Sequence, residues 1–328
     1  MKKVNWAVLG TANIARTEVI PGIKLSTHGN LYAIAGRKRE KLDKFQQRFD
    51  FEKVYINYDE ILNDPLVEAV YIPLSNELHK EWIIKSARKK KHILCEKPLV
   101  GTAEEIAEVM TVCKEEGVLF MEAFAYLHSP IITDLIHRVN EGVIGKIKLI
   151  ETTFHIPKQS AEDIRSRKET LGGSQYDVGS YNISLILKLM NQMPVKVEAM
   201  AQMTPAGVDQ YCHALLTFKD GALATSSCGM ILEDTTVSRI DRCFIQGTTG
   251  FINTQIPYNG KGKLSYEIVK GEESQIIEMD VPNNYALEID QFSKCVRGQE
   301  LPHVSNEFSY DVAKTQDQIL EKIGYFKR

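Results

Sequence analysis

Short apolar runs alternate with amphipathic stretches over the first part of the chain. The runs VNWAVLG, LYAIAG and HILCEKP are each followed by a segment in which apolar positions recur at helical spacing. Strands that are apolar on both faces and are each followed by a helix are typical of a parallel sheet covered on both sides. The pattern therefore predicts an α/β domain over residues 1–125.

The pattern changes after residue 125. The run KIKLIETTFHI alternates polar and apolar positions, and further strand signals follow one another with Asp-Gly turns between them, at residues 195–203, 211–230, 238–255, 263–271 and 274–281. Helical spacing returns at about 177–190, 283–299 and 306–326. This predicts an α+β domain over residues 126–328 with a large, mostly antiparallel, open-faced sheet. The last helix is a candidate to pack back on the first domain.

Composition narrows the classes of partner. The 328 residues carry a formal net charge of -3, which offers no basic surface for nucleic acid or an anionic membrane. The six cysteines form no C-x-x-C pair and the eight histidines no cluster, so no metal site is expected. No apolar stretch reaches the roughly 18 residues of a membrane span. With no recognisable signal peptide, we expect a cytoplasmic protein.

A glycine-centred loop follows the first predicted strand. In VLGTANIA, Gly10, Ala12 and Ala15 take the spacing of a G-x-G-x-x-G loop in which alanine replaces two glycines. Glycines at these places let backbone N–H groups approach a pyrophosphate at a helix N-terminus. A plain strand–turn–helix connection is the alternative. The residues expected to bind a dinucleotide here are Gly10, Thr11, Ala12, Asn13 and Ile14.

The end of the second predicted strand changes the expected cofactor. An NAD-binding Rossmann-type domain carries Asp or Glu there for the ribose 2′-hydroxyl. Here Gly36 takes that place, and Arg37 and Lys38 follow. A missing carboxylate and two added cations favour a 2′-phosphate, so the sequence predicts NADP rather than NAD. The alternative is that Arg37 is an ordinary exposed loop residue.

Five segments carry a more specific signal. In chain order they are WAVLGTANIA, YIPLSNELHKEW, CEKPL, MEAFAY and LGGSQYDVGSYNISL. In this order and spacing the sequence resembles the glucose–fructose oxidoreductase / inositol dehydrogenase / rhizopine catabolism (Gfo/Idh/MocA) family over nearly its whole length. Within that family it is most similar to the branch of dimeric dihydrodiol dehydrogenases and NADP-dependent xylose dehydrogenases.

The resemblance implies three catalytic residues. Lys97 of Glu-Lys-Pro would lie at the end of a parallel strand beside the nicotinamide and bind the substrate oxygen. A free phenol has a pKa of roughly 10 and a neighbouring ammonium lowers it, so Lys97 and Tyr181 make a workable acid/base pair. Asp177, four residues before Tyr181, would position the substrate and pair with Lys97. The structural alternatives are a loop-entry ion pair of Glu96 with Lys97, a helix cap at Asp177 and simple packing of Tyr181.

The resemblance also implies further binding residues. Leu74, Asn76 and His79 would surround the nicotinamide and its ribose, and Glu96 would lie near that ribose. His79 has an alternative as an ordinary residue of a helix start. In the second domain, Arg165 precedes the Gly-Gly of the family pattern and would lie near substrate or cofactor, and Tyr126 is a further candidate for substrate contact.

Two departures from the family pattern concern the substrate. Relatives of this branch often have Trp and Arg where this chain has Ala125 and Leu127, and Gly-Ala where it has Ser174 and Gln175. Loss of an aromatic wall would reshape the pocket, and the second change is expected to alter its lining. These departures therefore argue against carrying over either xylose or a dihydrodiol as the substrate.

These features predict an NADP-dependent oxidoreductase. A hydride would move between the nicotinamide and a hydroxyl-bearing carbon of a sugar, polyol or cyclic diol. The open sheet face predicts a homo-oligomer, either dimer or tetramer. One alternative is an NAD-dependent glycosidase of the same fold, which usually carries histidine in place of Tyr181. The other is a non-catalytic NAD(P)-binding sensor or co-regulator, which typically loses the lysine or the Asp-x-Gly-x-Tyr pair.

Overall fold

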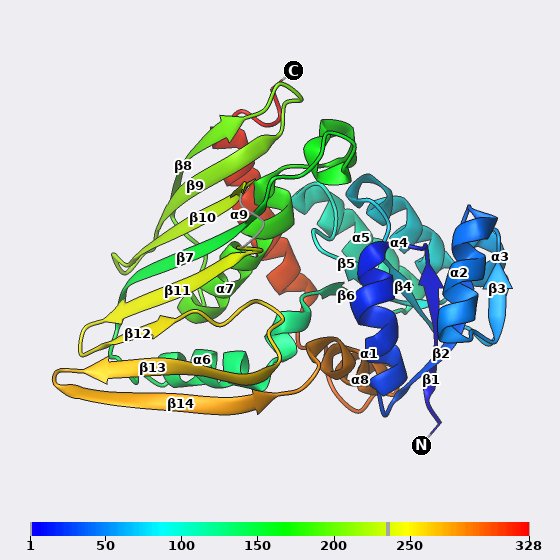
Figure 1. Ribbon diagram of the computed structural model, residues 1–328, viewed down its shortest axis with the longest axis horizontal. Coiled ribbons are helices and arrows are strands. Elements are labelled where there is room, and N and C mark those ends of the chain that lie inside the picture. Colours follow the sequence, from blue (N-terminus) through cyan, green and yellow to red (C-terminus); the bar gives the residue numbers. More distant parts are fainter. Residues whose placement is uncertain (1, 234–236, 328) are drawn as a thin grey trace. The chain divides into compact units, whose positions relative to one another are not determined.

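The first sheet is built from the short apolar runs of the N-terminal part. The computed structural model describes residues 2–233 and 237–327. Strands β4 (Ala69–Ile72) and β6 (Phe120–Ala123) are buried along their whole length, as expected for a parallel sheet with both faces covered. All its pairings are parallel, in the order β3-β2-β1-β4-β5-β6 (Figure 1). This is the strand order of a dinucleotide-binding Rossmann fold, and the predicted parallel sheet is confirmed.

The other elements around this sheet follow the predicted strand–helix alternation. The strands are β1 (Val4–Leu9), β2 (Gly29–Ala35), β3 (Lys53–Tyr55) and β5 (His92–Glu96). The helices are η1 (Ala15–Val19), α1 (Ile20–Leu25), α2 (Arg39–Phe49), α3 (Tyr58–Asn63), η2 (Asn76–Leu78), α4 (His79–Arg88), α5 (Ala103–Glu116), η3 (Ala125–His128) and α8 (Asn284–Val296).

Local sequence signals set the ends of α5. The hydroxyl of Thr102 accepts a hydrogen bond from the backbone N–H of Glu105, and two acidic residues lie in the first turn. Gly117 ends the helix in the left-handed conformation, with φ at 67°. An N-cap threonine and a C-terminal glycine are the residues that satisfy the free backbone groups at each end.

The second sheet is large and mostly antiparallel, as the sequence predicts. Its eight strands run in the order β14-β13-β12-β11-β7-β10-β9-β8, and β7 with β10 is its parallel pair. The strands are β7 (Ile147–Pro157), β8 (Lys196–Met203), β9 (Asp209–Thr217), β10 (Leu223–Leu232), β11 (Ile240–Gly247), β12 (Phe251–Thr254), β13 (Gly262–Lys270) and β14 (Glu273–Val281). The predicted Asp-Gly turn joins β9 to β10, where Gly221 has a φ of 84°.

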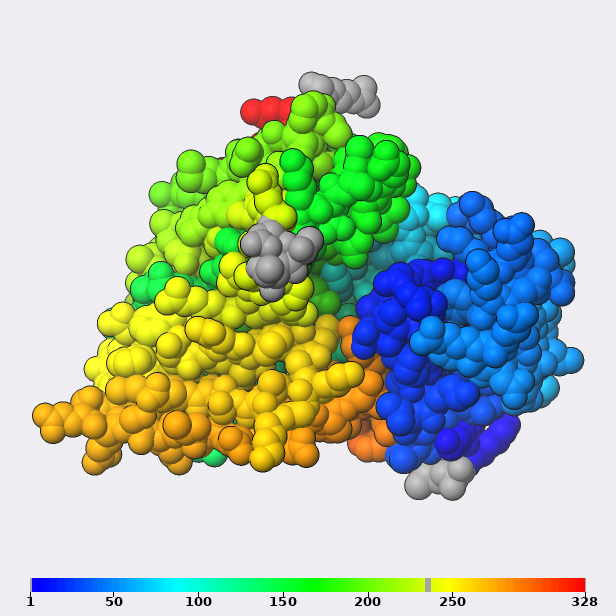
Figure 2. Space-filling view, viewed as in Figure 1, coloured from blue at the N-terminus to red at the C-terminus, as the bar shows by residue number. Residues whose placement is uncertain are grey.

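One face of this sheet is covered and the other is open. Inward residues such as Ile150, Cys212 and Ile252 are fully buried, and α6, α7 and α9 lie on their side (Figure 1). The alternate positions of the strands point outward, and in Figure 2 the yellow and orange atoms of β11 to β14 lie at the surface. The helices of this region are α6 (Pro130–Asn140), η4 (Ile164–Ser166), η5 (Lys168–Thr170), η6 (Gln175–Gly179), α7 (Ser180–Met190) and α9 (Asn306–Lys322).

The chain divides into two compact units. The first comprises Met1–His128 and Asn283–Tyr310, and the second comprises Ser129–Pro282 and Asp311–Arg328. Helix α8, which the sequence analysis grouped with the second domain, belongs to the first unit, where Trp6 Nε1 donates a 3.0 Å hydrogen bond to Ser293 Oγ. Helix α9 runs from one unit into the other. The domain limits 1–125 and 126–328 stay predictions.

Candidate functional site

The glycine loop lies at the carboxyl end of β1. Gly10 has a φ of 123°, and a Cβ built there would lie 3.0 Å from Leu74 Cδ2. Its N–H donates a 2.8 Å hydrogen bond to the carbonyl of Ala35, so the loop is tied to β2. Residues 11–14 are half exposed or exposed. The strand order reverses between β1 and β4, which is where dinucleotides bind this fold, and the tight, open loop fits a pyrophosphate.

A cation lies beside this loop. Arg37 follows Gly36 at the end of β2, is exposed, and hydrogen-bonds the hydroxyl of Tyr58. That hydroxyl lies 3.7 Å from the position of a Gly10 Cβ. Burial raises the pKa of Tyr58 and the Arg37 charge opposes this rise. Lys38 is also exposed, so the end of β2 offers two cations and no carboxylate.

His79 is enclosed in the fold. Its side chain is fully buried, with Nδ1 2.9 Å from the carbonyl oxygen of Pro98 and Nε2 3.0 Å from that of Leu74. Burial lowers the pKa of the imidazole, and the hydrogen bonds to these carbonyls oppose that shift. Because both ring nitrogens face backbone, His79 joins the segment after β4 to the Glu-Lys-Pro segment. Leu74 and Asn76 are half buried and stay candidates for direct cofactor contact.

The Glu-Lys-Pro segment ends β5. Glu96 Oε1 accepts a 2.5 Å hydrogen bond from the hydroxyl of Tyr71 on β4. Lys97 is half buried, and the Lys97–Pro98 peptide bond is cis. The next backbone N–H, of Leu99, donates a 2.9 Å hydrogen bond to Glu122 Oε1 on β6. Neighbouring strands therefore hold both sides of Lys97.

Two buried carboxyl groups near this segment were missed by the sequence analysis. Burial raises the pKa of Glu122 to about 7, against hydrogen bonds from Ser309 and from the N–H of Leu99. Burial also raises the pKa of Glu288 on α8 well above its usual value, and the charge of Glu96 adds to the effect. In the sequence, the only sign that Glu288 is buried is its place between two apolar residues, Leu287 and Ile289. Glu288 and Glu96 are some 190 residues apart in the sequence, so only the tertiary structure brings them near each other.

In the second unit, Asp177 is held by an arginine. Arg165 Nε donates a 2.7 Å hydrogen bond to Asp177 Oδ2, and Arg165 Nη1 lies 3.3 Å from Asp163 Oδ1. The carboxylate of Asp177 raises the pKa of Arg165 further above its usual range. Asp177 lies in η6, a π-helical turn, and such turns recur at functional sites. The structure thus joins two predicted site residues, Arg165 and Asp177.

Tyr181 follows on α7 in an aromatic environment. Its ring centroid lies 5.4 Å from that of Phe154 and 5.1 Å from that of Tyr258. Tyr181 is half buried, so part of the residue is open to solvent. The neighbouring aromatic rings fix the position of the phenol ring, and hydrogen bonds can then orient its hydroxyl.

Several expected pocket residues are buried. Tyr126 is fully buried with its ring 6.1 Å from that of Phe124, and Ala125 and Leu127 are buried as well. Ser174 and Gln175 are also fully buried, which corrects the expectation that they line the pocket.

These two residues instead anchor the start of η6. Ser174 Oγ donates a 2.6 Å hydrogen bond to Asp209 Oδ2, and the N–H of Gln175 donates a 2.7 Å bond to the same oxygen. The thiol of Cys228 donates to Gln175 Oε1. The polar pair that replaces Gly-Ala therefore fastens the π-turn that carries Asp177 to the sheet.

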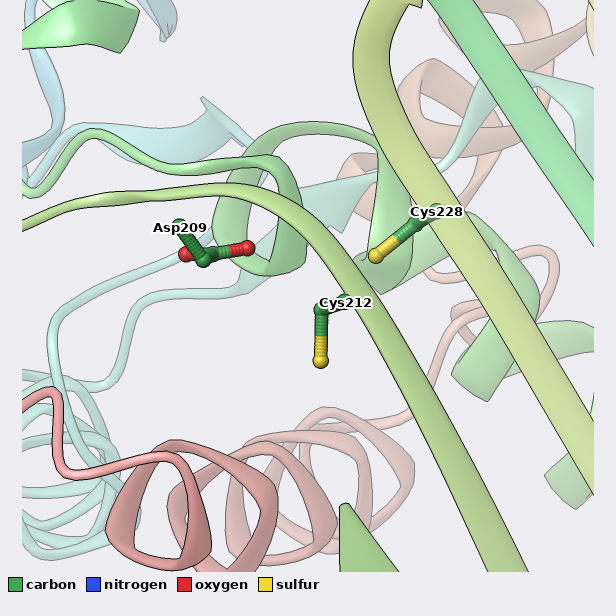
Figure 3. Close-up of side chains that lie close together, drawn as sticks. All are labelled: Asp209, Cys212 and Cys228. Carbon is green, nitrogen blue, oxygen red and sulfur yellow. The ribbon is translucent and has the colours of Figure 1, made fainter. Parts of the chain in front are cut away.

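The same carboxylate belongs to a buried group of metal-ligand types. Asp209, Cys212 and Cys228 are fully buried, and their ligand atoms lie within 4.8 Å of one another (Figure 3). Asp209 and Cys212 come from β9, and Cys228 is the cross-strand partner of Cys212 on β10. Burial raises the pKa of Asp209 to about 6 and that of Cys228 well above its usual value. A Cys228 thiol that donates a hydrogen bond and a carboxylate oxygen of Asp209 that accepts two are typical of a hydrogen-bonded core.

Comparison with known proteins agrees with this architecture. Residues 4–124 match the family described as "Oxidoreductase family, NAD-binding Rossmann fold", and residues 132–253 match the GFO/IDH/MocA C-terminal domain. The sequence is 31% identical to D-xylose 1-dehydrogenase (NADP(+)) 2 of Haloferax volcanii, over 96% of both chains. It is 26% identical to trans-1,2-dihydrobenzene-1,2-diol dehydrogenase of Xenopus laevis, over 97% of this chain and 98% of that one.

A solved structure is similar over the whole chain. The crystal structure of a 3-ketoreductase from Actinomadura kijaniata, in complex with NADP and TDP-benzene, matches with a TM-score of 0.89 at 27% identity and covers 98% of each chain. The chain therefore belongs to the Gfo/Idh/MocA family of oxidoreductases. Among the residues that the structure describes, no helix is long and apolar enough to cross a membrane.

Proposed function

We propose that this protein is an NADP-dependent dehydrogenase or reductase of a carbohydrate or a related cyclic alcohol. The observation that carries the proposal is Arg37, a cation beside the glycine loop that directly follows Gly36, the residue in the place where a NAD-specific domain carries an acid. Relatives support the substrate class, since they include an NADP-linked xylose dehydrogenase and a dTDP-sugar 3-reductase of Actinomadura kijaniata, 29% identical over 96% of this chain.

The cofactor contacts belong to the first unit. The N–H groups of the loop Gly10–Ile14 would receive the pyrophosphate, and Arg37 and Lys38 the 2′-phosphate. Leu74, Asn76 and Glu96 would line the nicotinamide ribose, with His79 supporting them from within the fold. When bound, NADP accepts or supplies the hydride at C4 of its nicotinamide.

The chain's own residues would move the proton. In the direction of oxidation, Tyr181 as phenolate takes the proton of the substrate hydroxyl while the hydride leaves the same carbon, so the alcohol becomes a carbonyl. Lys97 binds that oxygen and favours the phenolate. Asp177, oriented by Arg165, accepts a hydrogen bond from a neighbouring substrate hydroxyl.

The ketoreductase relative supports the choice of Lys97 and Tyr181. Solved structures of that protein include variants at a lysine and at a tyrosine, and these two residues have the same separation in sequence as Lys97 and Tyr181. We propose that Tyr126, which is buried, shapes the substrate site from within the fold.

The open sheet face supports a homo-oligomer. Leu215, Leu223 and Phe251 on three of its strands are exposed, and the ring of Phe251 lies 5.6 Å from that of Phe244. Exposed apolar side chains on an open sheet face are typical of a surface that binds another protein chain. Analytical ultracentrifugation should show a dimer or tetramer that Phe251→Glu weakens. We further propose a cytoplasmic location, because all six cysteines are buried and unpaired, as in reducing compartments.

The proposal is tested first by cofactor binding. Fluorescence titration should show tighter binding of NADPH than of NADH. Arg37→Ala should weaken NADPH about 10- to 100-fold, the usual effect of losing charge-assisted hydrogen bonds, and leave NADH nearly unchanged. The matched control is Arg39→Ala, since Arg39 is exposed in the same segment but pairs with Asp43 at 2.9 Å.

Turnover tests the chemistry. A screen of aldoses, polyols, cyclic diols and nucleotide-linked keto sugars should find an NADP-linked reaction. Lys97→Ala and Tyr181→Phe should each lower its rate roughly 10²- to 10⁴-fold while NADPH still binds. Preference for NADH, or a bound cofactor that never exchanges, would contradict the proposal and favour a glycosidase or a sensor.

A further inference from the structure

The turn between β12 and β13 brings a polar side chain to Tyr181. Asn259 Nδ2 donates a hydrogen bond to Tyr181 Oη over 3.5 Å. This is long for a hydrogen bond, as is common for catalytic contacts before a ligand binds. The other amide atom, Oδ1, is buried and has no partner in the part of the chain that the structure describes. The contact with Tyr181 is therefore the polar interaction of this side chain.

The backbone of the turn explains why an asparagine is possible but not why it is present. The N–H of Gly260 donates a 2.8 Å hydrogen bond to the carbonyl of Pro257, which closes a β-turn. Asn259 takes the third position of that turn with a φ of 60°. Glycine and asparagine both accept this left-handed conformation. Glycine would serve the turn equally well, so the amide group is left to be explained by what it contacts.

The neighbouring residue fixes the direction of the turn. Tyr258 is buried, and its N–H donates a 3.0 Å hydrogen bond to Asp241 Oδ1. Its carbonyl accepts a 3.1 Å bond from Arg239 Nη2, and its hydroxyl donates a 3.0 Å bond to Asn182 Oδ1 on α7. Two of these bonds tie the turn to Asp241 and Arg239 at the start of β11, and the third ties it to the helix that carries Tyr181. The hydrogen bonds of Tyr258 therefore fix the backbone next to Asn259, and this places the Asn259 amide beside Tyr181 Oη.

The other groups around Tyr181 leave the amide a distinct role. The rings of Phe154 and Tyr258 cover the phenol. Arg239 lies 4.7 Å from the centroid of the Phe154 ring and is paired with Asp241. On the helical side, Asp177 precedes Tyr181 by one turn and is paired with Arg165. Apolar walls disfavour an ionised phenol, whereas a nearby N–H donor favours it.

We propose that Asn259 is a positioning residue for proton transfer, whose amide N–H holds Tyr181 Oη and stabilises the phenolate that receives the substrate proton. The inference rests on the proposed role of Tyr181. It makes the turn after β12 a part of the acid/base machinery. Loss of the donor should make Tyr181 ionise at higher pH, and a negative charge in its place should do so more strongly.

The experiment reads the tyrosine directly. Protein labelled with ¹³Cζ-tyrosine is titrated with pH by NMR, and the Tyr181 signal is assigned by its absence in Tyr181→Phe. Asn259→Gly keeps the left-handed turn and removes the amide, and Asn259→Asp replaces the donor by an anion. The control Asn253→Asp places the same charge on an exposed position of β12. Thermal unfolding of each variant checks that the fold is kept.

We expect the ionisation constant of Tyr181 to fall about tenfold in Asn259→Gly and further in Asn259→Asp, with no change in Asn253→Asp. The limb of the pH–rate profile that reports Tyr181 should move in parallel. The inference is overturned if the titration of Tyr181 is unchanged in Asn259→Gly, because the amide then has no effect on the phenol. It is also overturned if Tyr181 ionises at lower pH, because the amide then accepts a hydrogen bond from the phenol. If the titration shifts and no NADP-linked turnover exists, the contact of Asn259 with Tyr181 is confirmed as a control of its ionisation, and the proposed function fails together with the role in proton transfer.

Discussion

Arg165 Nε donates a 2.7 Å hydrogen bond to Asp177 Oδ2, and so one unit contains both the predicted substrate carboxylate and the charge that orients it. Asp163 adds a second acceptor, because its Oδ1 receives the N–H of Arg165 at 2.9 Å and lies 3.3 Å from Nη1. The side chain of Asp177 is only 15% exposed and that of Arg165 39%. The pairing of Asp177 with Lys97 stays a prediction.

Removing the hydrogen bond between Arg165 and Asp177 should lower activity without weakening cofactor binding. Arg165→Met removes the charge and keeps the length, so Asp177 should lose its orientation and kcat/KM should fall about 10- to 100-fold. Arg165→Lys should recover only part of the rate, since an ammonium cannot reproduce the fork of a guanidinium. Steady-state kinetics and NADPH titration measure the two effects.

The matched control is Asp163→Asn, which leaves the bond between Arg165 and Asp177 intact. It should cost much less than Arg165→Met. Equal rates for Arg165→Met and the unaltered protein would show that Asp177 needs no partner. A loss of NADPH binding in Arg165→Met would place the arginine in the cofactor site instead.

The sequence was sufficient for the architecture because the deciding signals are local. Apolar runs that end in Gly10 and Gly36 predict parallel strands and the loops after them. Alternation and the Asp-Gly turn at Gly221 predict the second sheet. The ends of α5 are also set locally, because Thr102 caps its start and Gly117 ends it in the left-handed conformation.

What could not be predicted are contacts between distant segments. Glu288 approaches Glu96 only because α8 joins the first unit. Asp209 holds Ser174 and Gln175 through a strand that starts more than 30 residues later, so two residues expected in the pocket are instead part of the core. His79 was expected at the cofactor, and its two backbone contacts depend on where β4 and β5 end.

Gly10 offers a test of the cofactor loop. Its φ of 123° is a conformation that residues with a side chain rarely adopt, and an added Cβ would lie 3.0 Å from Leu74 Cδ2. Gly10→Ala should therefore cost about 1–3 kcal/mol of unfolding free energy and also weaken NADPH binding severalfold. Chemical denaturation and fluorescence titration measure the two quantities.

Gly117→Ala is the control for backbone strain alone. Gly117 also has a positive φ, at 67°, but an added Cβ there meets nothing within 4 Å. The Gly117→Ala protein should therefore be less stable than the unaltered protein but bind NADPH with the same affinity. Were Gly10→Ala to bind NADPH as tightly as the unaltered protein, the loop would not be the pyrophosphate site.

The buried carboxyl of Glu122 predicts a pH-dependent stability. Burial raises its pKa from 4.5 to about 7 in the folded protein. Between these values the folded state keeps the proton that the unfolded state releases. The contribution of Glu122 to stability is therefore greatest below about pH 4.5 and falls as the pH rises toward 7, by on the order of 3 kcal/mol. Glu122→Gln, which has the shape of the protonated acid, should remove this dependence.

Urea unfolding at pH values from 5 to 8 measures the effect, and two variants separate its sources. Burial also raises the pKa of Asp209, from 3.8 to about 6, so Asp209→Asn should flatten the lower part of the profile and leave the fall between pH 6 and 7. Glu115→Gln, at an exposed position, should reproduce the profile of the unaltered protein. If Glu122→Gln retains the fall between pH 6 and 7, Glu122 is ionised in the folded protein, and its bond to the N–H of Leu99 then carries a full charge beside Lys97.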